Sequence, residues 1–286
     1  MILIADGGST KCDWILLNNE GGQVFKTRSK GLNPAVFKEA ILEERLAENP
    51  ELAEVRDTIE KVHFYGAGCG TPTPRELLKS IIANYFTNAD EVLVMEDTVA
   101  AVHAATTEPG IVCILGTGSN SCYFDGEKIH QAVDSLGYIL MDEASGNYFG
   151  KRLIRDYYYK RMPPEIAEKF KKDFDLNSDT IKANLYRKEN PNTYLAHFAE
   201  FIFKNERNGY FYKLLHEGLT DFVHSRVMSY PQVNSVPVHF IGTIAFFSED
   251  IIRAVLQPYG IELGNIVRRP IDALIEHYRK NVLKKS

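Results

Sequence analysis

Met1-Ile-Leu-Ile-Ala-Asp6-Gly7-Gly8-Ser9-Thr10-Lys11-Cys-Asp-Trp14 opens the chain and decides its fold. Residues 1–5 form an apolar run of strand length, and a second apolar run begins at Trp14. The glycine-containing turn between them is typical of a β-hairpin. Glycine lets backbone N–H groups approach a bound anion, so the hairpin is a candidate phosphate cradle, beside which Asp6 could hold Mg²⁺ through water. An ordinary surface hairpin explains the stretch equally well.

Composition limits the classes of protein to consider. With 286 residues and 44% hydrophobic content, the chain is long enough for two domains with separate cores. The net charge of -5 gives no indication of nucleic-acid binding. We find no secretory leader and no apolar run of membrane-spanning length, so we expect a cytoplasmic protein with no membrane partner. The four cysteines form no C-x-x-C pair and are expected to be reduced and buried.

The pattern of elements repeats along the chain. The first part predicts strands at 1–5, 14–17 and 22–29, a helix at 36–48, a strand at 62–65, a helix at 74–86, a strand at 91–95 and a helix at 97–105. After Pro109-Gly110 the pattern restarts, with strands at 111–115, from 122 and at 128–133 around Gly116-Thr117-Gly118-Ser119-Asn120-Ser121. We interpret this as an internal repeat of architecture.

The remainder of the chain predicts a second domain with a helical insert. Residues 145–230 are largely helical, and then come a strand at 237–241, a helix at 244–256, a strand at 261–263 and a helix at 270–283. We expect domains at 1–108 and 109–286, with the insert at about 155–230 and the last helix a candidate to pack back on the N-terminal domain. Two such domains are expected to face each other across a cleft.

Three further positions have a functional and an ordinary interpretation. Two glycine turns at matching places in two halves favour a nucleotide whose phosphates contact both. Asp97 follows a strand and is suited to accept a hydroxyl proton, although an N-cap is the commoner role at such a position. Its neighbour Glu96 is an alternative metal ligand. Gly242-Thr243-Ile244 opens a helix after a strand, where a flat base can approach the backbone, but a routine turn fits as well.

The two halves resemble the sugar kinase, Hsp70 and actin superfamily, and within it the N-acetylglucosamine kinase and BadF/BadG/BcrA/BcrD-type ATPase group. Asp6-Gly7-Gly8-Ser9-Thr10-Lys11 is similar to the first phosphate motif, and Ile114-Leu115-Gly116-Thr117-Gly118-Ser119-Asn120 is very close to the second. Gly242-Thr243 lies where the adenosine motif is expected. The resemblance implies an α/β fold of two ribonuclease H-like (actin-like ATPase) domains with an interdomain cleft.

The resemblance also implies roles for individual residues. ATP would be bound by the two glycine turns and the adenosine motif: Gly7, Gly8, Ser9, Thr10, Lys11, Gly116, Thr117, Gly118, Ser119, Gly242 and Thr243. Asp6 would lie near Mg²⁺, and Asp97 would be the base that takes the sugar hydroxyl proton. The sugar would also contact Asn33, Gly68, Leu136, Gly137 and Asp142. The expected activity is phosphorylation of an amino sugar, N-acetylglucosamine or glucosamine, and residues 155–230 are a candidate homodimer surface or lid.

Departures from the group keep other functions open. Related kinases have Gly-Trp-Gly where this chain has Ser135-Leu136-Gly137, and glycine where it has Ala144. One alternative is an ATPase that couples hydrolysis to a partner protein. BadF/BadG relatives of that kind carry an iron–sulfur cluster, but Cys113 and Cys122 do not have the setting of cluster ligands. The other alternative is a non-catalytic sugar or nucleotide sensor.

Overall fold

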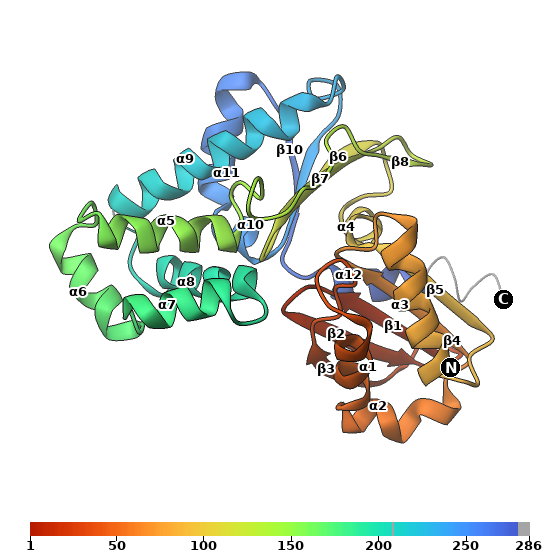
Figure 1. Cartoon of the computed structure of the whole chain (residues 1–286). Coiled ribbons are helices and arrows are strands. Elements are labelled where there is room, and N and C mark those ends of the chain that lie inside the picture. The colour runs from red at the N-terminus through yellow and green to blue at the C-terminus, as the bar shows by residue number, and fades with distance from the viewer. Residues whose placement is uncertain (208, 280–286) are drawn as a thin grey trace. The chain divides into compact units, whose positions relative to one another are not determined.

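Two five-stranded sheets with the same strand arrangement organise the chain (Figure 1). The computed structural model describes residues 1–207 and 209–279. Residues 1–104 and the segment from Pro270 form one compact unit, unit 1, and residues 105–269 form unit 2. In the part of the chain that is described, none of the helices combines the length and apolar character that a membrane crossing requires.

The sheet of unit 1 has the order β3-β2-β1-β4-β5. Its strands are β1 (Ile2–Gly7), β2 (Lys11–Leu17), β3 (Gln23–Lys30), β4 (Lys61–Gly66) and β5 (Glu91–Glu96). The first three strands are antiparallel, as the hairpin pattern predicted, while β4 and β5 run parallel to β1. The glycine turn after β1 and the loops after β4 and β5 therefore lie at the same edge of the sheet.

Helices cover both faces of this sheet because β1 and β2 are apolar on both. Leu3 and Trp14 face a core formed with α1 (Glu39–Ala47), α2 (Pro50–Val55) and α3 (Pro72–Tyr85). Ile2 and Ile4 face the other core, formed with α4 (Asp97–Ala105) and α12 (Pro270–His277). Just beyond α12, the buried hydroxyl of Tyr278 hydrogen-bonds with His63 and Tyr65.

The sheet of unit 2 has the order β10-β9-β6-β7-β8, which reproduces unit 1 strand for strand. Its strands are β6 (Gly110–Leu115), β7 (Ser119–Phe124), β8 (Ile129–His130), β9 (Val238–Ile241) and β10 (Leu263–Val267). The strand pairs of β6 with β7 and of β7 with β8 are antiparallel, and β9 is parallel to both β6 and β10. The predicted internal repeat of architecture is confirmed.

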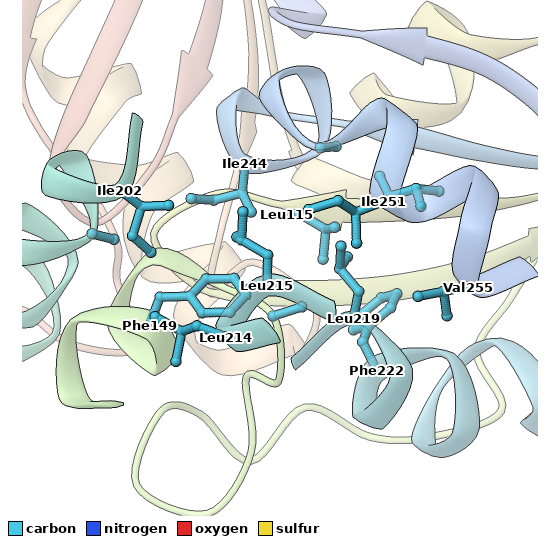
Figure 2. Close-up of a cluster of buried hydrophobic side chains, with 14 of the residues drawn as sticks. Leu115, Phe149, Ile202, Leu214, Leu215, Leu219, Phe222, Ile244, Ile251 and Val255 are labelled. Atoms are coloured by element: carbon cyan, nitrogen blue, oxygen red, sulfur yellow. The ribbon is translucent and has the colours of Figure 1, made fainter. Parts of the chain in front are cut away.

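The helices of unit 2 share one large apolar core with β6 (Figure 2). They are α5 (Gly146–Tyr158), α6 (Pro164–Asp173), α7 (Ser178–Tyr186), α8 (Pro191–Lys204), α9 (Gly209–Ser225), α10 (Thr243–Phe247) and α11 (Glu249–Leu256). Leu115 at the end of β6 packs in the same cluster as Phe149 of α5 and Ile244 of α10. This packing fixes the starts of both helices next to the turn that follows β6.

Several expected elements differ from those observed. The helix expected at 244–256 is interrupted at Ser248, which is fully buried and leaves helical geometry with φ -120°. The strand expected at 128–133 is limited to two residues, because its pairing with β7 is confined to Ile129 and His130. The strand expected at 261–263 lies instead at Leu263–Val267, where pairing with β9 holds it. Of the helix expected at 270–283, residues 280–283 lie outside the described residues.

Candidate functional site

The candidate residues of unit 1 collect at the carboxyl ends of three neighbouring strands. In the parallel register, Gly7 of β1 lies beside Gly66 of β4, and Gly66 lies beside Glu96 of β5. The glycine hairpin, the loop after β4 and Asp97 at the start of α4 therefore share one edge. Sheets of this kind bind ligands at that edge, because the loops there carry donors and acceptors beyond the packed strands.

The hairpin between β1 and β2 has a tight backbone. The N–H of Gly8 donates to the carbonyl of Lys11 over 2.8 Å. A Cβ at Gly7 would lie 2.3 Å from the ring of Phe64, so glycine is required there. Residues 8–10, the predicted phosphate contacts, therefore lie in a turn that is held by the hydrogen bond between Gly8 and Lys11 and by the close packing of Phe64 on Gly7.

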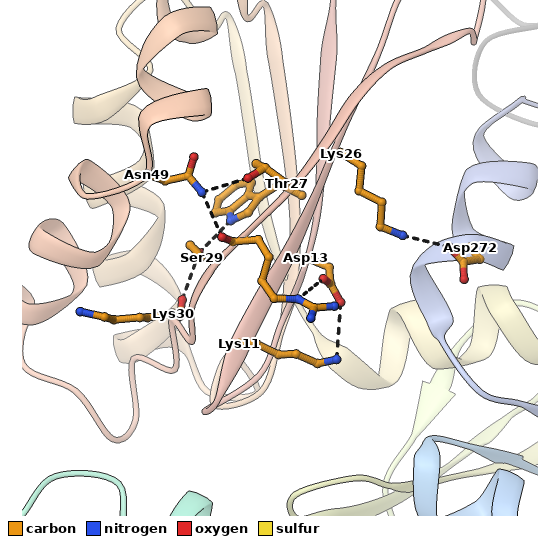
Figure 3. Close-up of polar contacts among 10 residues, drawn as sticks. Lys11, Asp13, Lys26, Thr27, Ser29, Lys30, Asn49 and Asp272 are labelled. Atoms are coloured by element: carbon orange, nitrogen blue, oxygen red, sulfur yellow. Dashed lines mark hydrogen bonds and ion pairs between the residues drawn. The ribbon is translucent and has the colours of Figure 1, made fainter.

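Asp6 carries a carboxylate whose charge is poorly compensated within unit 1. It lies opposite Asp13 in the ladder, but Asp13 accepts a hydrogen bond from Arg28 Nε over 2.7 Å and lies 3.8 Å from Lys11 Nζ (Figure 3). Burial and then the charge of Asp13 raise the pKa of Asp6 to about 6, and Lys11 opposes the shift without cancelling it. Such a carboxylate fits a divalent cation, which would supply the missing positive charge.

Asn33 joins the candidate phosphate hairpin, between β1 and β2, to the loop after β4. Its side chain is buried, Nδ2 donates to Ser9 Oγ over 2.8 Å, and Oδ1 accepts from the N–H of Ala35. Gly68 lies directly against it with a φ of +81°, and a Cβ there would lie 2.0 Å from Asn33 Oδ1. The predicted positions Ser9, Asn33 and Gly68 are therefore brought together.

Asp97 is the first residue of α4 and is partly buried. Its charge adds to the burial that raises the pKa of the Cys69 thiol to about 12, so the Asp97 carboxylate lies near the loop after β4. The adjacent Glu96 accepts a hydrogen bond from Thr98 Oγ1 over 3.2 Å, and a Cβ at Gly70 would lie 2.8 Å from its Oε1. The edge thus holds two neighbouring carboxylates, the candidate base and the alternative metal ligand.

The second glycine turn, between β6 and β7, is held by the start of α5. Within the turn, the N–H of Gly116 donates to the carbonyl of Gly118 over 2.9 Å. The N–H of Gly146 donates to the carbonyl of Gly116 over 2.8 Å, and the N–H of Asn147 donates to that of Thr117 over 3.0 Å. Residues about 30 positions later in the sequence therefore set the backbone of this turn.

The start of α10 packs on the same turn. Gly242 has a φ of +114°, and its N–H donates to the carbonyl of Val267 over 2.9 Å. A Cβ at Gly242 would lie 2.3 Å from the carbonyl oxygen of Leu115 and 3.4 Å from the nitrogen of Gly116. The predicted adenosine contacts, Gly242 and Thr243, therefore lie next to the predicted phosphate contacts of unit 2.

Asp142 also contacts this turn. It is 7% exposed, its Oδ2 accepts from Asn147 Nδ2 over 2.9 Å, and its carboxylate accepts from the N–H of Ser119. Burial raises the pKa of Asp142, while these two hydrogen bonds act in the opposite direction. Sequence reasoning missed Asn147, because a polar residue in the first turn of a helix is unremarkable by itself.

The backbone around Asp142 is strained. Asp142 has a φ of 71° and Ala144 a φ of 57°, in the left-handed region that costs a residue with a Cβ about 1–2 kcal/mol. A glycine in place of Ala144 would adopt this conformation without that cost. This loop therefore has two residues with a Cβ in the left-handed conformation.

Leu136 and Gly137 belong to an exposed loop whose ends are held by hydrogen bonds to Met141 and from Arg226. Leu136 is 61% exposed, and its N–H donates to Met141 Sδ over 3.4 Å, which folds the loop back on itself. The fully buried Arg226 donates to the carbonyl of Val133 over 3.0 Å and to Met141 Sδ over 3.3 Å. The loop therefore presents the aliphatic side chain of Leu136 to solvent.

Comparison with solved structures gives a likeness over the whole chain. The crystal structure of a protein from Porphyromonas gingivalis, named "Putative N-acetylglucosamine Kinase", is 35% identical with a TM-score of 0.90, and the match covers 98% of this chain and 99% of that chain. A protein of the same name from Chromobacterium violaceum is 14% identical with a TM-score of 0.74, over 96% and 98% of the two chains.

A more distant structure shares the fold alone. The ROK family glucokinase from Streptomyces griseus, solved in complex with glucose and AMPPNP, is 14% identical with a TM-score of 0.64, over 100% of this chain and 99% of that chain. No family model matches the chain, and no curated protein does.

Proposed function

Because the chain belongs to the N-acetylglucosamine kinase-like family of sugar kinases, in the actin-like ATPase superfamily, we propose that it transfers the γ-phosphoryl group of ATP to an amino sugar. N-acetylglucosamine and glucosamine are the first candidates. The observation that carries the proposal is a relationship repeated in both units. Each glycine turn has a serine hydrogen-bonded to a candidate sugar contact: Ser9 Oγ accepts from Asn33, and the backbone N–H of Ser119 donates to Asp142.

In this proposal, Asp97 is the general base. It accepts the proton of the sugar hydroxyl while the new oxygen–phosphorus bond forms and the bond between the γ-phosphorus and the ADP oxygen breaks. Asn33 and Gly68 bind the sugar on unit 1, and Asp142 binds it from unit 2. Support for the assignment of Asp97 comes from its place at the end of β5, near the loop that carries Gly68.

The nucleotide contacts are proposed at both glycine turns. The phosphates accept hydrogen bonds from the backbone at residues 7–11 and 116–119, and adenosine lies at Gly242 and Thr243. Mg²⁺ supplies positive charge to the phosphates when it is bound. Asp6 holds the ion through water. The raised pKa of Asp6 supports this assignment, because burial and the charge of Asp13 disfavour its ionised form and a nearby cation would stabilise that form.

The experiment that tests the proposal is ADP release from Mg-ATP across a panel of sugars. The panel contains N-acetylglucosamine, glucosamine, N-acetylmannosamine, glucose and a reaction without sugar. ADP release that depends strongly on one sugar supports the proposal and names the substrate. Equal ADP release in every reaction contradicts it and indicates an ATPase, and no release in any reaction contradicts it in favour of a sensor.

A further inference from the structure

Asn147 has a side-chain setting that stability alone does not explain. It lies in the first turn of α5, its side chain is fully buried, and Oδ1 has no hydrogen-bond partner among the described residues. A buried carbonyl without a partner destabilises the folded state, which offsets part of what the other contact of this side chain contributes. What asparagine provides here is the hydrogen bond from Nδ2 to Oδ2 of Asp142, over 2.9 Å.

The backbone of Asn147 contacts the second glycine turn at the same time. Its N–H donates to the carbonyl of Thr117 over 3.0 Å. Asp142 in turn accepts from the N–H of Ser119, and a Cβ at Gly118 would lie 2.7 Å from Asp142 Oδ2. Asn147, Asp142 and the turn therefore form a closed set of contacts within unit 2.

We propose that Asn147 is a positioning residue that fixes the carboxylate of Asp142 against the second glycine turn, and so couples sugar binding to phosphate binding. The inference rests on the proposed function, in which Asp142 contacts the sugar and residues 116–119 contact ATP. The left-handed backbone of Asp142 makes such a restraint necessary, because a strained residue keeps its conformation only where its surroundings hold it.

Three other charged groups act on Asp142, and the Asn147 variants change none of them. The buried Arg226 lowers the pKa of Asp142, and Glu143 raises it. Burial lowers the pKa of Lys151, and the charge of Asp142 opposes that shift. A changed titration of Asp142 in an Asn147 variant therefore reports the lost amide.

Asn147→Ala removes the amide donor and keeps the backbone N–H that donates to the carbonyl of Thr117. Because a hydrogen bond to a charged group is lost, we expect kcat/KM for the sugar to fall about 10- to 100-fold. The acidic limb of its pH profile moves to higher pH, since the carboxylate of Asp142 loses a partner that favours its ionised form. The KM for ATP rises in the same variant, because the turn and the carboxylate are held together.

Asn147→Asp keeps the size of the side chain and replaces the donor by a second carboxylate. The start of α5 tolerates a negative charge there, so this variant is expected to fold even if the alanine variant does not. Repulsion between the two carboxylates moves the acidic limb further than alanine does, because one proton is then shared by the pair. Asn184→Ala is the matched control, since it removes an amide that donates to a backbone carbonyl of α7.

The measurements are the pH profile of kcat/KM, sugar binding by calorimetry, and titration of the Asp142 carboxylate by carbon-13 NMR. A KM within twofold of the wild-type value together with an unmoved acidic limb in both Asn147 variants would overturn the inference. If the wild type neither binds nor phosphorylates any sugar, the proposed function fails instead. The NMR titration then still decides whether Asn147 holds Asp142, because an unchanged Asp142 pKa in both variants contradicts the positioning role.

Discussion

Asn33 Nδ2 lies 2.8 Å from Ser9 Oγ, so one hydrogen bond connects a candidate sugar contact to the candidate phosphate hairpin of unit 1. Asn33→Ala removes both the proposed sugar contact and the partner of the serine. We expect the KM for the sugar to rise at least about tenfold and the KM for ATP to rise less, because the hydroxyl of Ser9 can rotate to a new partner. Steady-state kinetics with each substrate varied in turn measures both effects.

Asn49→Ala is the control for this variant. Asn49 is another buried asparagine of unit 1, and its side chain caps α2 and contacts Thr27 and the carbonyl of Arg28 (Figure 3). Its loss should lower the free energy of unfolding by about 1 kcal/mol and leave both KM values unchanged. Equal KM changes in the two variants would mean that Asn33 acts through stability alone.

Gly68→Ala tests whether the loop after β4 must approach Asn33 closely. The new Cβ would lie 2.0 Å from Asn33 Oδ1, so the amide has to move. We expect a higher KM for the sugar with a smaller effect on ATP. Gly260→Ala serves as the comparison, because Gly260 also has a positive φ but a Cβ there meets no atom within 4 Å. A sugar KM raised equally in both variants would contradict the proposed contact.

Asp97→Asn removes the proposed base and preserves the shape of the side chain. We expect ATP binding to persist and kcat to fall about 100-fold or more, the usual scale for loss of a general base. Single-turnover phosphorylation of the sugar, with calorimetry for ATP binding, separates the two effects. Asp90→Asn at the opposite end of β5 is the control and should retain full activity. A fully active Asp97→Asn enzyme would rule out the role.

The pH dependence of metal binding follows from Asp6. Because its pKa is about 6, protons compete with the cation below that pH. We expect the apparent affinity for Mg²⁺ to fall about tenfold for each pH unit below 6, as measured by the Mg²⁺ dependence of ATP turnover. An affinity that stays constant from pH 7 to pH 5 would exclude Asp6 as the group that holds the ion.

In the absence of metal, the ionised carboxylate of Asp6 lowers the stability of the folded state. Its pKa is raised from the ordinary value of 3.8, so the folded state favours the protonated form and loses stability as the pH rises from about 4 to about 6. Asp6→Asn should therefore raise the free energy of unfolding at pH 7 by up to roughly 3 kcal/mol while it weakens the Mg²⁺ dependence. Asp57→Asn, at an exposed carboxylate of the same unit, should change neither.

The elements that surround the glycine turns could be predicted because local chemistry determines them. Asp6-Gly7-Gly8 interrupts two apolar runs, and the hairpin follows. The break of the helix at Ser248 could not be predicted, since the apolar pattern continues through Phe247 and the break depends on burial of the serine. The short helix α2 was not predicted, although Asn49 before Pro50 is a local signal for a helix start.

The candidate site also contains residues that the sequence predicts and residues that it does not. Ser9 and Ser119 are recognisable from the residues beside them, but the contacts that order Asn33 and Asp142 join distant positions. Arg226 reaches the carbonyl of Val133 across 93 positions of sequence, and no local pattern marks it as the anchor of that loop. Asn147 can be recognised as part of the site only from the structure, in which its Nδ2 donates to Asp142 Oδ2.

The helix that completes unit 1 imposes an order on the assembly of the nascent chain. Ile2 and Ile4 of β1 share a buried cluster with α4 and with Ile271 and Leu274 of α12, so the cover of this apolar face is completed only when residues beyond 269 have been synthesised. Unit 2 is continuous in sequence and can close earlier. The burial of β1 is therefore completed late in synthesis, and a chaperone that shields its remaining apolar surface until then would reduce aggregation.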